Sequence, residues 1–205
     1  MEIFLSVGEP SGDLHGANLM GEMQRRSPEL TFSGLGGPRM AQAGCRLLSD
    51  MSELAVMGVF PVLAKLPEFF SLIGEVDRYL GNHRPDAAVL VDYPGFNLRL
   101  AKAVKARLPA VRNIFYVSPQ VWAWNRGRIP KMARFLDLML CIFPFEKPLY
   151  EASGLPTVFV GHPMLDSLEA KRTDPPREPD LVGLFPGSRV KEVRRIFPVM
   201  LEAAA

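Results

Sequence analysis

The chain has 205 residues, of which 48% are hydrophobic and 22% are charged, an ordinary globular composition that excludes a disordered chain. Its 24 Lys+Arg and 22 Asp+Glu residues give a formal net charge of +2, too weak a bias to indicate a nucleic-acid partner. No apolar run approaches the ~18 residues that span a bilayer, so we expect a protein that is soluble or bound to a membrane surface. Cys45 and Cys141 are far apart and have no His or Cys at metal-ligand spacing, which fits a reducing cytoplasm.

Short apolar runs alternate with helical patterns along the whole chain. The predicted strands are Ile3–Val7, Ala87–Val91, Asn113–Val117, Leu138–Ile142, Val158–Val160 and Leu181–Phe185. The predicted helices are Gly12–Arg26, Phe96–Arg107, Arg128–Phe135 and Glu146–Ala152. This rhythm predicts an α/β fold, with a Rossmann-like parallel sheet that carries helices on both faces.

A Pro-rich charged stretch, residues 171–180, interrupts this pattern and is typical of a semi-rigid linker. We therefore expect a first domain over residues 1–170 and the first βα unit of a second domain over residues 181–205. The chain ends within a helical pattern that has no stop signal, so the second domain is expected to be truncated.

The loop after the first predicted strand contains Glu9, Ser11 and Asp13 between glycines. In open parallel sheets, ligands bind outside the carboxyl ends of the strands. Glycines allow a close approach of the backbone, and the start of the following helix offers N–H groups to a ligand. Helix capping by Ser11 or Asp13 is an equally open interpretation. A second Gly-rich turn, residues 34–38, is a candidate of the same kind, with a similarly weak signal.

Asp92 follows directly after the apolar run Ala87–Val91. A carboxylate at that position costs desolvation energy unless it has a partner or a function. It could accept a proton from a substrate hydroxyl, or it could form a cap or an Asx turn before the next helix.

Both tryptophans, Trp122 and Trp124, lie in one polar loop with Arg126. This set suits stacking on a sugar or base and pairing with a phosphate, although burial of at least one ring is an open alternative. His162 ends a later strand, where a lone histidine is more often structural. The turn that contains Ser188 and Arg189, with Glu192 on the following helix, favours binding of a diphosphate. No Asp-rich metal motif accompanies it, and no metal or other cofactor is expected.

Seven stretches occur in the order found in one enzyme family and cover nearly the whole chain. They are GEPSGDLHGA (8–17), GLGGPRM (34–40), VDYPGFN (91–97), YVSPQVWAWNRGR (116–128), FPFEKPLY (143–150), VGHP (160–163) and LFPGSRVKEV (184–193). Together they resemble lipid-A-disaccharide synthases, inverting glycosyltransferases of the GT-B fold. The chain would then be the N-terminal domain of a GT-B fold with the start of the second domain.

The resemblance implies a reaction and roles for the residues that match. UDP-2,3-diacylglucosamine would donate its sugar to 2,3-diacylglucosamine 1-phosphate (lipid X), giving the disaccharide 1-phosphate and UDP. Asp92 would be the base, and Ser188, Arg189 and Glu192 would hold the donor diphosphate. The residues expected on the acceptor side, or in structural loops there, are Glu9, Ser11, Asp13, Asn97, Trp122, Arg126 and His162.

A membrane surface is a further expected partner, because the implied substrates are acylated. Apolar residues recur at helical spacing over residues 57–80, which indicates either a buried helix or a membrane-contacting one. The expected contacts are Phe60, Phe69 and Leu72, and the expected location is the cytoplasmic face of the inner membrane. Alternatives are another GT-B enzyme, such as a MurG-like transferase or a UDP-sugar 2-epimerase, or a non-catalytic lipid-binding fragment. The oligomeric state stays open.

Overall fold

The computed structural model describes residues 1–51, 66–169, 172–173, 178–187 and 190–204, with the backbone alone at residues 66–70 and 167. The chain divides into two compact units, Met1–Asp166 and Ser167–Ala205, and each is described by itself. The domain limits expected at residues 170 and 180 stay a prediction.

The first unit contains all the strands of the described chain, and a short last helix begins at its end. The strands are β1 (Glu2–Val7), β2 (Thr31–Gly36), β3 (Arg46–Asp50), β4 (Ala87–Val91), β5 (Arg112–Tyr116), β6 (Leu138–Cys141) and β7 (Thr157–Phe159). The helices are α1 (Pro10–Arg26), α2 (Pro38–Gln42), α5 (Leu66–His83), α6 (Pro94–Arg107), α7 (Val121–Trp124), the 3-10 helix η1 (Arg126–Arg128), α8 (Ile129–Met132), α9 (Glu146–Glu151) and α10 (Met164–Glu169).

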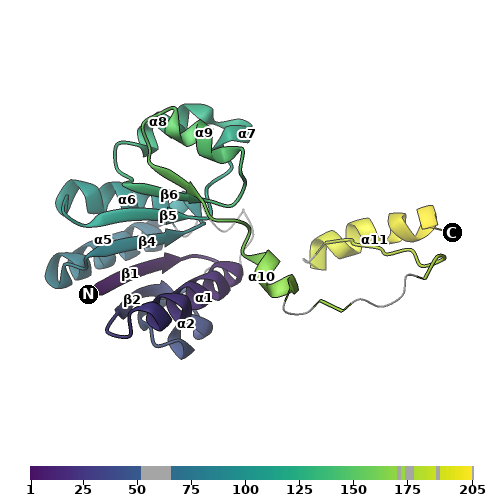
Figure 1. Cartoon of the computed structure of the whole chain (residues 1–205), viewed down its shortest axis with the longest axis horizontal. Helices are drawn as coiled ribbons and strands as arrows, with labels where there is room; N and C mark the ends of the chain where they lie inside the picture. Colours follow the sequence, from purple (N-terminus) through teal and green to yellow (C-terminus); the bar gives the residue numbers. More distant parts are fainter. Residues whose placement is uncertain (52–65, 170–171, 174–177, 188–189, 205) are drawn as a thin grey trace. The chain divides into compact units, whose positions relative to one another are not determined.

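The seven strands form one parallel sheet in the order β3-β2-β1-β4-β5-β6-β7 (Figure 1). In the centre, Ile3 of β1 lies opposite Phe32 of β2 and Ala87 of β4. The strand order reverses direction between β1 and β4. In sheets of this type, the crevice beside such a reversal is the usual ligand site.

Alternation along the strands builds a separate core on each face of the sheet. On one face, Leu5 and Val89 pack with Met20 of α1 and Met40 of α2. On the other face, strand residues pack with α5, α6, α8 and α9. The predicted α/β sheet with helices on both faces is thus confirmed, and it follows from strands whose successive side chains point to opposite sides.

Five of the predicted strands are confirmed within one or two residues, and the sequence patterns missed part of the sheet edge. Strand β3 was not predicted, because only one neighbour pairs with it and its side chains are at most partly buried. Strand β2 includes Gly34 and Gly36, which the sequence indicated as a turn. A Cβ atom at Gly34 would overlap the carbonyl oxygen of Leu5 on β1, so a glycine is required inside this strand.

The predicted strand Leu181–Phe185 is wrong. These residues have no regular secondary structure, and Leu181, Val182 and Phe185 are exposed. A strand is stable only when a neighbouring strand satisfies its backbone groups, and the described part of Ser167–Ala205 contains none. The helix expected after this segment is present as α11 (Val190–Ala204).

Candidate functional site

The candidate site lies where β1 and β4 end, beside the reversal of strand order. The backbone turns sharply there, because Asp92 and Tyr93 both have left-handed conformations with φ of 48° and 47°. Two consecutive non-glycine residues in this region are uncommon and indicate a conformation that the surroundings enforce. The backbone N–H of Asp92 donates to the carbonyl of Tyr116 at 2.9 Å, and α6 begins two residues later with Pro94.

Asn97 holds this turn against the neighbouring strand end. Its side-chain amide donates to the carbonyl oxygens of Asp92 at 2.7 Å and of Val91 and Ser6 at 3.2 Å. Its Oδ1 accepts the hydroxyl of Ser6 at 2.7 Å. Asn97 and Ser6 are fully buried, so Asn97 positions the Asp92 backbone from inside the protein and is itself closed to a ligand.

The environment of Asp92 makes its carboxylate more basic than that of a free aspartate. Burial raises the pKa of Asp92 above its usual value, and the negative charge of Glu9 raises it further. A hydrogen bond from the Tyr93 backbone acts in the opposite direction, because it stabilises the charged form. The carboxylate is partly exposed, so it can still reach a ligand.

The loop after β1 passes directly beneath the ring of Tyr93. A Cβ atom at Gly8 would clash with this ring, so the close approach requires glycine at that position. The next residue is the exposed Glu9, and exposed Ser11 follows in the first turn of α1. Glu9 is near enough for its charge to act on Asp92, whereas no hydrogen bond among the described residues joins the Ser11 side chain to the turn.

Asp13 caps a helix, but not the helix on which it lies. Its Oδ1 accepts the N–H groups of Gly37 at 2.8 Å and Met40 at 3.0 Å, and its Oδ2 accepts that of Arg39 at 3.0 Å. These donors form the start of α2, and Asp13 is buried beneath them. The carboxylate is therefore committed to the protein backbone. A cavity of about 180 Å³ opens beside it, lined also by Glu9 and Met51.

The two tryptophans have different environments. Trp122 is partly buried, and its indole N–H donates to Glu146 Oε1 at 2.9 Å. Trp124 is 67% exposed and has the guanidinium of Arg128 over its ring at 5.1 Å. Arg126 donates from Nε to the carbonyl of Trp122 at 2.9 Å, so it supports the loop that carries both rings.

Glu146 supports the loop that carries Trp122, a role that no local sequence pattern indicated. It is fully buried, and its second oxygen accepts the N–H of Phe143 at 3.1 Å. A buried carboxylate persists only where hydrogen bonds replace its water, and here they tie the Trp122 loop to α9. The stretch FPFEKPLY that contains Glu146 was the available signal.

His162 borders a second cavity, of about 240 Å³, with Tyr116 and Asp166 among its lining residues. His162 Nδ1 accepts the backbone N–H of Met164 at 3.2 Å. His15 lies near enough that the charge of His162, after the larger effect of burial, lowers the pKa of His15. Burial and the charge of Asp166 raise the pKa of Tyr116. His15 and Tyr116 carried no separate sequence signal.

The expected diphosphate turn belongs to the second unit and is described in part. Gly187 has a φ of 106°, and a Cβ atom there would lie 2.8 Å from Glu192 Oε2. Gly187 therefore lies against the first turn of α11, which contains Glu192. Ser188 and Arg189 lie outside the described residues.

One expected membrane contact needs correction. Leu72 is only 9% exposed and packs in the core with Val76 and Leu80, so it offers no surface to a bilayer. Phe60 and the side chain of Phe69 lie outside the described part of the chain. No helix within the described ranges is both long and apolar enough to cross a membrane. The same ranges hold no group of three His, Cys, Asp or Glu residues that could bind a metal ion.

Solved structures share this fold at low sequence identity. A UDP-GlcNAc 2-epimerase from Neisseria meningitidis aligns with a TM-score of 0.60 at 11% identity, covering 82% of this chain and 48% of its own. A putative UDP-N-acetylglucosamine 2-epimerase from Listeria monocytogenes aligns with a TM-score of 0.58 at 11% identity, covering 87% and 50%. These likenesses concern the fold alone, the Rossmann-like N-terminal domain of a GT-B architecture.

Sequence relatives are much more similar. Lipid-A-disaccharide synthases from Geobacter metallireducens, Geobacter sulfurreducens and Myxococcus xanthus are 45%, 44% and 40% identical, each over 98% of this chain and 54% of the relative. The chain therefore spans about half the length of the curated relatives it matches. The profile of the family described as lipid-A-disaccharide synthetase matches residues 3–205, and the chain belongs to that family.

Proposed function

We propose that the chain forms the acceptor side of a glycosyltransferase that makes the lipid A disaccharide. The donor is UDP-2,3-diacylglucosamine, the acceptor is 2,3-diacylglucosamine 1-phosphate, and the second product is UDP. Family membership supports this reaction over the alternatives of a MurG-like transferase, a UDP-sugar 2-epimerase or a non-catalytic lipid-binding fragment. The observation that carries the mechanism is the partly exposed Asp92 on an enforced turn at the strand reversal.

In this mechanism Asp92 accepts the proton of the acceptor 6-hydroxyl. The hydroxyl oxygen bonds to the anomeric carbon of the donor, and the bond from that carbon to the diphosphate oxygen breaks. The electron pair leaves with UDP, and attack from the opposite face inverts the anomeric centre. The transition state is oxocarbenium-like, so a well-placed base of modest strength suffices.

The remaining site residues have supporting parts in this proposal. Ser188, Arg189 and Glu192 bind the donor diphosphate, with the start of α11 behind them. Glu9 raises the basicity of Asp92, and Asn97 fixes its backbone. Trp122, Arg126 and His162 shape the acceptor side. Asp13 holds the start of α2 in place beside the site, and Ser11 stays a weaker candidate for the acceptor side.

The enzyme would act at the cytoplasmic face of the inner membrane, because both substrates carry acyl chains. The contact is assigned to Phe60 and Phe69 from the apolar pattern of residues 57–80, and buried Leu72 is withdrawn from it. Phe60→Ser with Phe69→Ser should reduce sedimentation with anionic vesicles and leave the melting temperature unchanged. Unfolding of this double variant, or unchanged sedimentation, would indicate that the segment is a buried helix and does not contact the membrane.

The decisive test concerns Asp92. In the complete enzyme, Asp92→Asn should lower kcat by at least about 100-fold, because the amide cannot accept the proton. Asp86→Asn is the matched control, since Asp86 is exposed and precedes the opposite end of β4, and it should leave kcat nearly unchanged. Glu9→Gln should move the acidic limb of kcat/KM to lower pH, because it removes a charge that raises the Asp92 pKa. Normal turnover in Asp92→Asn would reduce Asp92 to a turn former.

A further inference from the structure

Positive charge is concentrated in one part of the chain although the net charge is only +2. Between Asp92 and Asp137 there is no acidic residue, whereas nine Lys and Arg residues occur. They are Arg99, Lys102, Lys105, Arg107, Arg112, Arg126, Arg128, Lys131 and Arg134. The rest of the chain is therefore acidic on balance, and the stretch between Asp92 and Asp137 carries an excess of positive charge.

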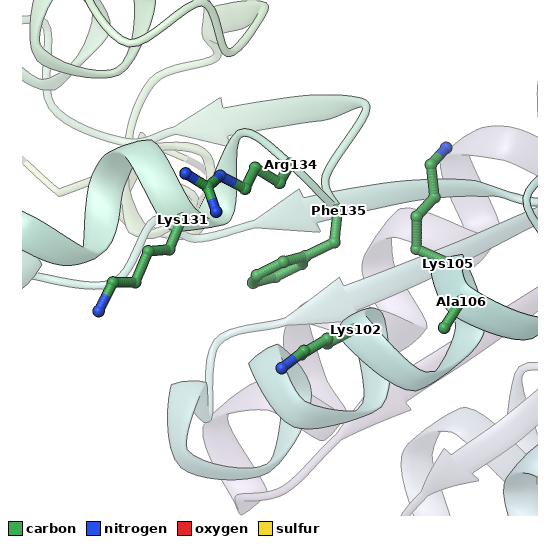
Figure 2. A pocket seen from close by; sticks show the side chains of 6 residues that line it. All are labelled: Lys102, Lys105, Ala106, Lys131, Arg134 and Phe135. Atoms are coloured by element: carbon green, nitrogen blue, oxygen red, sulfur yellow. The ribbon is translucent and has the colours of Figure 1, made fainter.

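Four of these cations line one cavity, of about 450 Å³. Lys102 and Lys105 come from α6, whereas Lys131 and Arg134 come from α8 and the segment that follows it. Figure 2 shows the ring of Phe135 between these two sides, with the Lys102 ammonium beside it. The cavity thus combines several positive charges with an aromatic surface.

The frame of this cavity is fixed by buried hydrogen bonds. The side-chain amide of fully buried Asn113 donates to the carbonyls of Phe135 and Ala101, both at 2.8 Å. Asp137 accepts Lys105 at 2.7 Å with one oxygen and the N–H of Asn113 at 2.8 Å with the other. The two sides are therefore held at a set separation before any ligand binds, which lowers the entropic cost of binding.

Lys105 pairs with Asp137 in this frame, so the other three cations of the cavity remain available to bind an anion. Lys102, Lys131 and Arg134 are exposed and have no ion-pair partner among the described residues. Like charges gathered around one cavity repel one another, and an anion in the cavity would relieve this repulsion. The arginine can bind two oxygens of a phosphoryl group with its planar fork, while the lysines act as point charges.

This cavity is separate from the candidate site at Asp92. Asn113 is the second residue of β5 and Asp137 directly precedes β6, so the cavity lies at the amino ends of these strands. Asp92 follows the carboxyl end of β4, and all these strands are parallel. A ligand in the cavity would therefore not occupy the place of the reacting groups.

We infer that this cavity is a second binding site, for a phosphoryl group carried on a molecule with an apolar or aromatic part. The volume is larger than a phosphate requires and falls within the range of small-molecule sites, and the ring of Phe135 offers a surface to the remainder of the ligand. Two sources supply this chemistry, a free phosphorylated compound and the headgroup of an anionic lipid.

The test compares charge-matched variants of the 205-residue chain. Lys102→Ala with Arg134→Ala removes two cations from the cavity, and Arg25→Ala with Arg26→Ala removes two from the exposed end of α1. All four side chains are exposed, so circular dichroism should show unchanged folding. Binding of inorganic pyrophosphate is measured by calorimetry. Sedimentation is measured with phosphatidylcholine vesicles, with and without phosphatidylglycerol.

The cavity variant should bind at least one probe about tenfold more weakly than the unchanged chain, whereas the α1 variant should bind normally. Loss confined to pyrophosphate identifies a soluble ligand, and loss confined to phosphatidylglycerol vesicles identifies a lipid headgroup. Arg134→Lys should retain part of the affinity, because it keeps the charge and loses the fork. Equal losses in the two charge-matched variants, or no loss in either, would overturn the inference. Neither probe requires the proposed transfer reaction, so a failure here leaves that proposal intact.

Discussion

The basicity of Asp92 has a cost in stability. Its pKa is raised above the value of the unfolded chain, first by burial and then by Glu9, so folding favours the protonated form. Such a group contributes stability at pH values below its unfolded pKa, and this contribution is lost as pH rises through the folded pKa. At pH values above its folded pKa, the charged Asp92 therefore destabilises the fold.

Asp92→Asn should accordingly raise the melting temperature at pH values above the folded pKa of Asp92, because an amide has no charge to desolvate. The difference should shrink as pH falls and Asp92 becomes protonated. Thermal denaturation of the variant and the unchanged chain, followed at a series of pH values by circular dichroism, measures this. A variant that is less stable at pH values above that pKa would mean that the carboxylate makes favourable contacts as an anion.

Asp13 should matter for stability rather than for chemistry. Asp13→Ala removes the acceptor of three buried N–H groups at the start of α2, and should lower the free energy of unfolding by about 2–3 kcal/mol. Ser11→Ala, an exposed position in the same first turn of α1, should change it by less than about 0.5 kcal/mol. Urea denaturation gives both values. Similar small losses for both would show that the Asp13 bonds are replaced by water.

At the scale of single residues, the sequence revealed positions more readily than partners. Asp92 could be recognised as a candidate because a carboxylate directly after an apolar run costs desolvation energy, whichever residues surround it in the fold. The roles of Asn97 and Glu146 could not, since Asn97 binds Ser6, 91 residues away, and Glu146 binds Trp122, 24 residues away. Such pairings depend on which strands become neighbours, and no local pattern encodes that.

Two glycines test how the elements are built. Gly34 lies in β2, where a Cβ atom would overlap the Leu5 backbone on β1, whereas a Cβ atom at Gly21 in α1 would meet nothing within 4 Å. Gly34→Ala should lower the free energy of unfolding by more than about 3 kcal/mol, because a backbone oxygen cannot move aside as a side chain can. Gly21→Ala should raise the free energy of unfolding by about 0.5–1 kcal/mol, since alanine loses less conformational entropy than glycine when it enters a helix.

Urea denaturation of the two variants measures both effects. An unchanged stability for Gly34→Ala would mean that β1 and β2 can separate without disturbing the sheet. A loss of stability in Gly21→Ala would show that the added methyl group meets a neighbouring part of the protein.

Elements that are buried on both sides were the ones that sequence patterns predicted best. Strand β4 has all five residues buried and reads as a continuous apolar run. Strand β3 has none fully buried, and α2 is only five residues long and depends on Asp13 from another helix. Short elements of this kind are stabilised by tertiary contacts, so their own residues carry little signal.

At the scale of the whole molecule, the two units differ in how they are stabilised. The first has an apolar core on each face of its sheet. In α11 of the second unit no residue is buried, and Ile196, Phe197, Val199 and Leu201 are exposed. An isolated helix of this length is marginal in water, and Pro198 inside it removes one backbone hydrogen bond.

Hydrogen exchange should therefore separate the two units in the 205-residue chain. Amides of α11 should exchange with little protection, whereas those of Ala87–Val91 should exchange only through global unfolding of their unit. Gly34→Ala should speed exchange in β4 and leave α11 unchanged. Because α11 backs the proposed diphosphate turn, we also expect no measurable disaccharide formation by this chain alone. Protection of α11 equal to that of β4, or substantial transfer activity, would contradict this prediction. Either result would show that the second unit has stabilising contacts other than those within Ser167–Ala205.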